Sequence, residues 1–250
     1  KTSHAIELLG GSGKMYAFEK DQRRATALLK RLKVLTGFQQ SRGSKDGEVK
    51  KIKQKKWVKK GQCLAHGGPG VQVEVHIMDF LQTKPWTAPW NQVEVLLVDP
   101  SCSGSGLPEH HLDANDTTPK RRLERLASFQ RRILQHAMKF PKARTVVYST
   151  CSLHRIENED VVEAALATNP ATFHVVEALP WWRNAPRPEA EGDMAETWPS
   201  WSHLCLRSEP SYHRCRGFFL CRLDRQGGVT AEDGMTPRKR PKMSGWLHQQ

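Results

Sequence analysis

Two apolar segments, each followed by a cysteine, most constrain the fold of this chain. The segment VEVLLVD (93–99), continuously apolar as in a strand buried on both faces, leads into Cys102, and TVVYS (145–149) leads into Cys151. Between them, apolar residues recur every three or four positions over residues 123–137, which predicts an amphipathic helix. In a strand-helix-strand unit the two strands are parallel, so their carboxyl ends share one edge of the sheet. We therefore expect Cys102 and Cys151 to lie close together.

Strands and helices alternate along the rest of the chain as well. Apolar runs predict strands at residues 14–18, 71–77, 173–179 and 217–223. Helical spacing predicts one helix at residues 22–35 and another after Cys151, where Glu157, Glu159 and Asp160 would complement the helix dipole. This alternation predicts a doubly wound α/β sheet, which binds its ligands beyond the carboxyl ends of the strands.

Acidic residues follow three of the predicted strands. Glu19 could accept hydrogen bonds from the ribose hydroxyls of a nucleotide-like cofactor, although acidic residues also end strands for solubility. Asp79 could accept a hydrogen bond from an adenine amino group or cap a loop. Asp99 could hold the Watson-Crick edge of a pyrimidine, while Gly104 and Gly106 would let the chain approach a planar ligand closely.

The two thiols at strand ends suit chemistry on a pyrimidine ring. Cytosine C5 becomes nucleophilic only after a group has added to C6, and a cysteine thiolate can make that addition. A second thiol beside the adduct could assist its release, so Cys102 and Cys151 fit this reaction. The alternative is a pair of buried structural thiols. We favour that alternative for the four other cysteines, which are Cys63, Cys205, Cys215 and Cys221.

Charge and cysteine spacing limit the class of protein. A formal net charge of +13 over 250 residues favours a polyanionic partner, and nucleic acid fits better than a membrane. We find no leader-like segment, and no uncharged apolar run approaches the roughly 20 residues that span a bilayer. The cysteines form no C-x-x-C pair, which favours a reducing compartment. Because no second ligand pair follows Cys63 and His66, we expect no metal there.

Two segments lie outside this alternation. Residues 39–70 contain eight lysines between Lys45 and Lys60 and are interpreted as an inserted, solvated loop, with or without a role in gripping RNA. Residues 225–250 form a predicted disordered polar tail, whose basic cluster 238–242 is either a nuclear address or a solvated tail.

Several motifs together resemble one enzyme family. The segments VDPSCSGSG, FQRRILQHAMKF, VYSTCSL and ENEDVV are similar to the Nol/Sun-domain family of RNA cytosine-C5 methyltransferases, and within it to members that act on large-subunit rRNA. The resemblance implies a Rossmann-like class I S-adenosylmethionine-dependent methyltransferase sheet over residues 1–224. It also implies a covalent adduct between a cysteine and cytosine C6. The location that it implies is the nucleus, and within the nucleus the nucleolus.

The family's functional residues carry over onto matching positions. The resemblance makes Cys151, in the S-T-C-S motif, the nucleophile and Cys102, in the D-P-S-C motif, the thiol that assists product release. It assigns Asp99 to base positioning. The implied S-adenosylmethionine contacts are Lys1, Glu19, Arg24, Asp79 and Asp99.

The chain departs from the family pattern at its start. In the family, an Ala-Pro-Gly-Asn loop binds the cofactor and continues into Lys-Thr-Ser-His. This chain begins at that Lys, so we expect the first strand and most of the cofactor loop to be missing from this segment. In the family that strand lies between the strands represented here by residues 14–18 and 93–99, so two apolar edges would lack a neighbour. We therefore expect this segment alone to be poorly stable and inactive. The alternative function is a catalytically inactive RNA-binding or ribosome-assembly remnant of the same fold.

Overall fold

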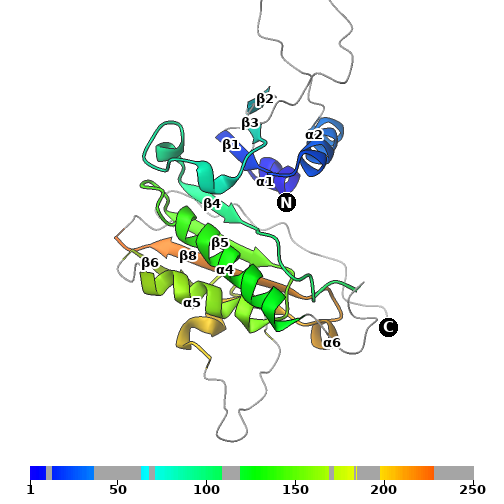
Figure 1. Cartoon of the computed structure of the whole chain (residues 1–250), viewed down its shortest axis with the longest axis vertical. Coiled ribbons are helices and arrows are strands. Elements are labelled where there is room, and N and C mark those ends of the chain that lie inside the picture. The colour runs from blue at the N-terminus through cyan, green and yellow to red at the C-terminus, as the bar shows by residue number, and fades with distance from the viewer. Residues whose placement is uncertain are drawn as a thin grey trace, which may run out of the picture. The chain divides into compact units, whose positions relative to one another are not determined.

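The fold is seen in a computed structural model that describes residues 1–9, 13–36, 63–67, 71–108, 119–168, 172–182, 184 and 198–227. The chain divides into two compact units, Lys1–Lys84 and Pro85–Gln250. Each unit contains its own β-sheet with helices beside it (Figure 1). The predicted α/β class is confirmed, whereas the strands form two sheets instead of one continuous sheet.

The first unit is a three-stranded sheet with two helices. Its elements are α1 (Thr2–Leu8), β1 (Gly13–Phe18), α2 (Gln22–Thr36), β2 (Cys63–Gly67), β3 (Val71–His76) and the 3-10 helix η2 (Phe80–Gln82). β3 lies in the middle, parallel to β1 and antiparallel to β2. Ile6 and Leu32 pack with the buried side chains of β3 in a small core.

Strand β2 corrects the sequence interpretation of residues 39–70. Cys63–Gly67 pairs with β3 along its whole length, where a loop was predicted. Hydrogen bonding to an existing strand stabilises an extended conformation that local composition does not favour. The remainder of the lysine-rich stretch, and the basic cluster near the end of the chain, lie outside the described residues.

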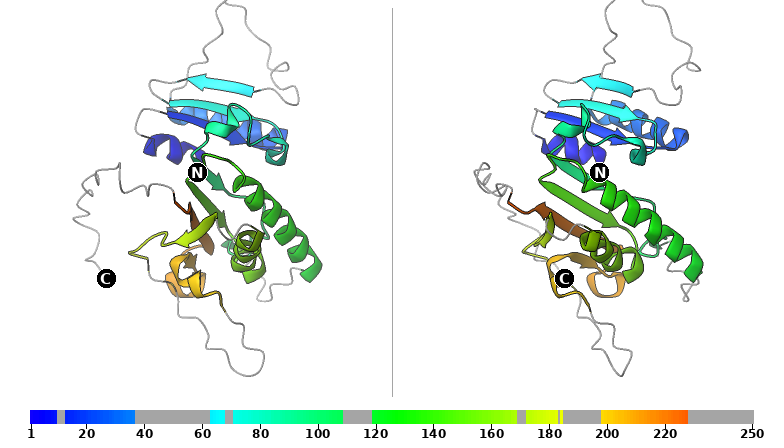
Figure 2. Two further views of the ribbon diagram at one scale, coloured as in Figure 1. Left: turned by 90° about the vertical axis from the view of Figure 1, so that its left-hand side faces the viewer. Right: turned by 60° about the vertical axis from the view of Figure 1, so that its left-hand side comes forward.

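The second unit is built around a larger mixed sheet. Its elements are η3 (Trp90–Gln92), β4 (Val95–Val98), α4 (Lys120–Ala137), β5 (Thr145–Thr150), η4 (Arg155–Glu157), α5 (Glu159–Thr168), β6 (Phe173–Val176), η5 (Ser200–Leu204), β7 (Leu206–Ser208), α6 (Pro210–His213) and β8 (Phe218–Arg225). The strand order is β4-β5-β8-β6, with β7 also paired to β8. Helices α4 and α5 lie beside each other along this sheet in both views of Figure 2.

The predicted strand-helix-strand unit is present in this sheet. β4 and β5 are parallel and adjacent, and α4 connects them. One face of α4 is apolar and buried through Ile133, Leu134 and Ala137, as its three-and-four spacing predicted. β5 lies between β4 and β8, and the side chain of Tyr148 within it is fully buried. The carboxyl ends of β4 and β5 therefore meet at one edge.

Strand β4 is not buried on both faces as its apolar sequence predicted. Leu96 and Val98 are buried, but Val95 is 52% exposed and Leu97 is 59% exposed. β4 is the edge strand of the second unit's sheet, and within the described residues of that sheet it pairs with β5 alone.

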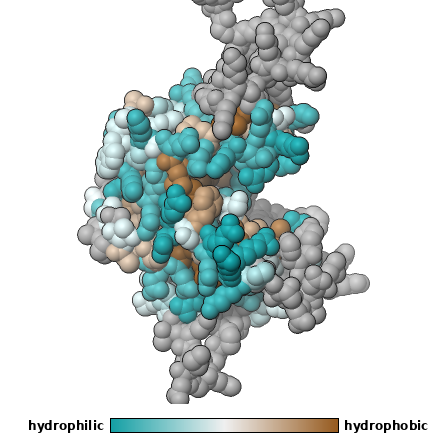
Figure 3. Space-filling model, viewed as in Figure 1, coloured by the Kyte–Doolittle hydropathy of each residue, from teal (hydrophilic) through white to brown (hydrophobic). Residues whose placement is uncertain are grey.

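Hydrophobic residues interrupt a mostly hydrophilic surface on the face shown in Figure 3. Among the described residues, no helix is both long and apolar enough to cross a membrane.

A buried ion pair links α5 to β7. The Arg207 side chain is 8% exposed and that of Glu159 is fully buried, and their closest nitrogen and oxygen atoms are 2.7 Å apart. A second nitrogen of the guanidinium donates to the Leu153 carbonyl at 2.9 Å, close after Cys151 in the chain. Glu159 lies in the first turn of α5, as the sequence predicted, and its carboxylate also satisfies a buried arginine.

We predict that Glu159→Gln lowers the free energy of unfolding of the chain by about 3 kcal/mol, because the buried Arg207 loses its close counterion and keeps the more exposed Glu209 carboxylate, 3.8 Å away. Glu94→Gln is the matched control: it breaks an exposed pair with Arg144, which is worth less than about 1 kcal/mol. Urea denaturation of both variants measures the two effects. Equal losses would contradict the prediction.

Candidate active site

Cys102 and Cys151 form the centre of the candidate active site. The two sulfur atoms are 3.1 Å apart, and both side chains are half-buried. Cys102 lies in the loop after β4, and Cys151 immediately follows β5. The structure thus brings together the two thiols that the parallel strands were expected to align.

Backbone contacts between loops bring the two sulfurs into this position. The Gly106 N–H donates to the Cys151 carbonyl at 2.9 Å, and the Gly217 N–H donates to the Gly106 carbonyl at 2.8 Å. A Cβ atom at Gly106 would lie 2.6 Å from the Gly217 carbonyl oxygen, so only glycine fits. The expectation that Gly106 makes room for a planar ligand is therefore wrong: it makes room for a neighbouring loop. Gly104 adopts a left-handed φ of 79°.

A fully buried carboxylate joins the two cysteine loops. Glu157 Oε1 accepts the backbone N–H of Ser103 at 2.9 Å, and Glu157 Oε2 accepts the hydroxyl of Ser152 at 2.6 Å. Ser103 follows Cys102 and Ser152 follows Cys151, so the carboxylate holds each loop one residue beyond its thiol. Gln130 of α4 donates to Glu157 Oε1 at 2.9 Å and to the Ser101 carbonyl at 3.0 Å.

The role of Glu157 was not predicted from the sequence. Its position beside other acidic residues suggested the first turn of a helix, where a carboxylate complements the helix dipole. Its partners lie 54, 27 and 5 residues away, so no local spacing indicates the contact. One signal in the sequence does indicate it. Glu157 begins the segment ENEDVV, which is shared with the family and lies close after Cys151.

Burial changes the acidity of one thiol of the pair. Desolvation, with the hydrogen bond to the Cys151 sulfur, raises the pKa of Cys102 to about 12. Either S–H of the pair can donate to the other sulfur. The sulfurs of the buried Cys205 and Cys221 contact each other, as expected for structural thiols, whereas Cys215 is exposed, contrary to expectation.

Asp99 lies beside the thiols at the end of β4. Its side chain is exposed, and its Oδ1 accepts a hydrogen bond from the Ser149 hydroxyl at 3.2 Å. Ser149 is buried in β5 two residues before Cys151. This contact holds the carboxylate at the same sheet edge as the two sulfurs, where a ligand could reach it.

The other predicted cofactor residues lie in the first unit. Glu19 follows β1, and its Oε1 accepts hydrogen bonds from the Asp21 N–H at 2.8 Å and from Arg24 at 2.9 Å. Both hydrogen bonds go to Oε1, so Oε2 of Glu19 can accept a hydrogen bond from a ribose hydroxyl.

Asp79 and Lys1 have visible structural partners. Asp79 caps η2 through the Leu81 N–H at 3.0 Å and accepts from Lys20 at 3.3 Å. This agrees with the capping alternative, while its role toward adenine stays a prediction. Lys1 is exposed and precedes α1, and its backbone carbonyl accepts the Ala5 N–H at 2.9 Å. Among the described residues, no group of three or more His, Cys, Asp or Glu side chains could hold a metal ion.

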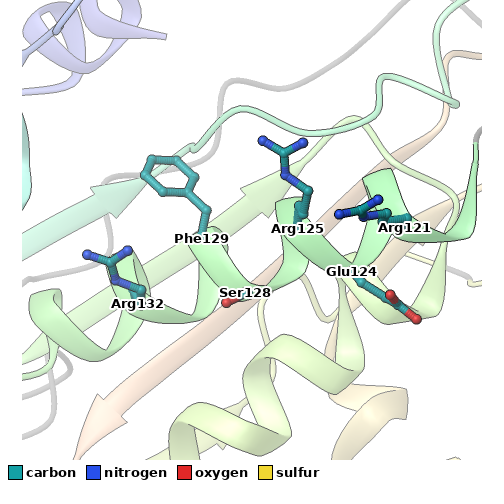
Figure 4. Close-up of a pocket in the computed structure, with 6 residues that line it drawn as sticks. All are labelled: Arg121, Glu124, Arg125, Ser128, Phe129 and Arg132. Atoms are coloured by element: carbon teal, nitrogen blue, oxygen red, sulfur yellow. The ribbon is translucent and has the colours of Figure 1, made fainter.

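Helix α4 presents a basic surface. Arg121, Arg125 and Arg132 extend from one side of the helix with Phe129 between them, as Figure 4 shows. These side chains line a shallow hollow and are exposed, and Phe129 is 37% exposed. No salt bridge joins these arginines to a carboxylate within the described part of the chain.

The second unit is thus an α/β sheet with two adjacent thiols at the carboxyl ends of its parallel strands. Residues 45–224 match the family model described as 16S rRNA methyltransferase RsmB/F, and the chain belongs to this family. It is 34% identical over 227 residues to the 28S rRNA (cytosine-C(5))-methyltransferase of Mus musculus, covering 90% of this chain and 40% of that protein. It is 35% identical to the putative methyltransferase NSUN5C of Homo sapiens, covering 90% and 59% of the two chains.

Solved structures agree on the fold. A methyltransferase homolog from Pyrococcus horikoshii aligns with a TM-score of 0.58 at 21% identity, covering 89% of this chain and 57% of that one. NSun6 from the same organism, solved with SFG, aligns with a TM-score of 0.54 at 19% identity, covering 89% and 44%. The chain spans about 40 to 60% of the length of the first two curated relatives.

We predict that Glu157→Ala lowers the free energy of unfolding by about 3 kcal/mol or more, because three buried donors lose their acceptor. The control is Glu163→Ala, an exposed position on α5 with the same loss of charge. Chemical denaturation measures both changes. A loss below 1 kcal/mol for Glu157→Ala would show that the carboxylate does not hold the loops.

Proposed function

We propose that this chain is the catalytic part of an S-adenosylmethionine-dependent RNA (cytosine-5) methyltransferase that acts on large-subunit rRNA. The observation that carries the proposal is the pair of sulfur atoms 3.1 Å apart at the carboxyl edge of parallel strands. A single thiol would suffice for addition to a pyrimidine, whereas two adjacent thiols suit addition followed by release. The curated relatives named as rRNA (cytosine-C(5))-methyltransferases support the same assignment.

Cys151 is the proposed nucleophile. Its thiolate adds to cytosine C6, and the electron pair of the C5–C6 double bond then becomes available at C5 for methylation. The choice rests on the S-T-C-S motif that contains Cys151, and Cys102 is the thiol beside it. Its S–H can stabilise a thiolate on Cys151 through the contact between the sulfurs.

Cys102 is the proposed release residue. After the methyl group is in place, a base such as a water molecule takes the C5 proton. The electron pair of that C–H bond re-forms the C5–C6 double bond, and the bond between Cys151 and C6 breaks with its electron pair on sulfur. The Cys102 S–H then stabilises the departing Cys151 sulfur. Asp99, at the same sheet edge, is the proposed acceptor for the exocyclic amino group of the cytosine.

S-adenosylmethionine, when bound, supplies the electrophilic methyl group. The residues proposed to hold it are Lys1, Glu19, Arg24, Asp79 and Asp99. The support for Glu19 is its Oε2, which can accept a ribose hydroxyl, and Arg24 fixes the orientation of that carboxylate. The NSun6 structure with SFG, an analogue of S-adenosylmethionine, supports this cofactor class.

The RNA is proposed to contact the basic surface of α4. The guanidinium groups of Arg121, Arg125 and Arg132 can pair with phosphates, and the exposed ring of Phe129 can stack on a base. A net charge of +13 supports a polyanionic substrate. Large-subunit rRNA as the substrate implies work in the nucleus, and we propose the nucleolus.

We predict that Cys151→Ala abolishes methylation by the gene product that contains this sequence, whereas Cys102→Ala lets a covalent protein-RNA adduct accumulate. The first change removes the attacking atom, and the second removes the S–H that assists its departure. Denaturing gel electrophoresis with labelled rRNA fragments detects the adduct, and Cys215→Ala is the control. Adduct formation by Cys151→Ala would exchange the roles of the two cysteines.

We predict that replacing Arg121, Arg125 and Arg132 together by Gln lowers the affinity of the chain for RNA. The same change should make that affinity less dependent on salt concentration. The slope of log affinity against log salt should fall by roughly 2, because each lost phosphate contact removes about 0.7. The matched control replaces Arg23, Lys30 and Arg31 of α2, which are also exposed. Fluorescence anisotropy with labelled single-stranded RNA measures both slopes, and equal slopes would contradict the role of α4.

A further inference from the structure

The two sulfurs of the candidate site are positioned for a reaction with each other. They are 3.1 Å apart, and a disulfide needs about 2.05 Å, so roughly 1 Å of movement suffices. Hydrogen bonds from both loops to Glu157 and the Gly106 contact with the Cys151 carbonyl hold this geometry. Half-buried side chains leave the pair within reach of a small oxidant.

We propose that Cys102 and Cys151 form a reversible, peroxide-sensitive dithiol, in which an intramolecular disulfide removes the attacking thiolate. The disulfide itself requires only this geometry. Its effect on methylation rests on the proposed function. Cys102 thereby has a second role besides release, as the resolving thiol that captures an oxidised Cys151.

The reaction balances with a hydroperoxide as the oxidant. The Cys151 thiolate attacks one peroxide oxygen, forming an S–O bond and breaking the O–O bond, which gives a sulfenic acid and a hydroxide ion that takes a proton from solvent to become water. The Cys102 sulfur then attacks the sulfenic sulfur, the S–S bond forms, and the hydroxyl leaves with the Cys102 proton as a second water. The two sulfurs lose two electrons in total, and the two peroxide oxygens gain them. A dithiol reductant reverses the change by thiol-disulfide exchange.

Other cysteines provide internal comparisons within the described part of the chain. Cys205 and Cys221 also contact each other, but they are only 3% and 0% exposed, so peroxide does not reach them readily. Cys215 is exposed, and its sulfur contacts the Arg216 carbonyl instead of another thiol. Among the cysteines whose side chains the structure describes, only the pair at the sheet edge combines a partner thiol with access.

The dithiol would also limit irreversible damage. A cysteine sulfenic acid without a partner is oxidised further to sulfinic acid, which ordinary reductants do not reverse. Because Cys102 lies against Cys151, capture of the sulfenic acid competes with this second oxidation. Cys215, which has no such partner, should instead proceed along the irreversible route.

The test is peptide mass spectrometry on the whole chain. The reduced chain is treated with a small excess of hydrogen peroxide, alkylated and digested without reductant. We expect a linked pair of peptides containing Cys102 and Cys151, two hydrogen atoms lighter than their sum, which disappears with dithiothreitol. In Cys102→Ser, we expect sulfinic acid at Cys151 in place of the link, and Cys215→Ser should leave the link unchanged.

Two results would overturn the dithiol. One is full alkylation of Cys102 and Cys151 while Cys215 is oxidised. The other is a link between Cys205 and Cys221 that forms faster. A parallel methylation assay on the gene product separates this inference from the proposed function. Methylation that is lost with peroxide and restored with dithiothreitol supports both, whereas full activity in the linked state contradicts the switch. A link in a protein whose reduced form never methylates RNA supports the dithiol and contradicts the proposed function.

Discussion

One buried carboxylate supports the arrangement of the candidate site. Glu157 accepts hydrogen bonds from Ser103, Ser152 and Gln130, which come from the two cysteine loops and from the helix that connects their strands. Each interaction satisfies a buried donor, so loss of the carboxylate would leave several polar groups without an acceptor. The 3.1 Å separation of the sulfurs depends on these contacts and on the glycine that lets the loops touch. The proposed chemistry and the proposed dithiol rest on this same constraint.

The parallel strands β4 and β5 are the second feature on which the candidate site depends. They place Asp99, Cys102 and Cys151 at one sheet edge, as strand ends do throughout α/β enzymes. The residues proposed for the cofactor lie mostly in the first unit, where Glu19 follows β1 and Asp79 follows β3. Membership of the RsmB/F family supports the proposal that both groups of residues serve one reaction.

Local sequence patterns predicted much of the fold. The apolar runs around Val146, Val73 and Phe219 are strands, and the three-and-four spacing before Ala137 is a helix, because side-chain periodicity reflects which face is buried. Patterns failed where pairing or exposure depends on a distant partner. Cys63–Gly67 is a strand only because β3 pairs with it, and Leu97 is exposed because β4 is an edge. The short β7 and α1 were also missed, since neither is long enough to show a period.

The sequence by itself determined the α/β class through the alternation of strands and helices, and the family through shared motifs. It also determined which two cysteines should meet, because connectivity through a helix makes neighbouring strands parallel. The tertiary structure decided how they meet. It placed Glu157 between two cysteine loops that are 49 residues apart in the sequence, fitted Gly106 against Gly217, and buried Cys102 enough to raise its pKa. Those features depend on packing between distant segments and on the exclusion of water, and no local pattern of residues records either one.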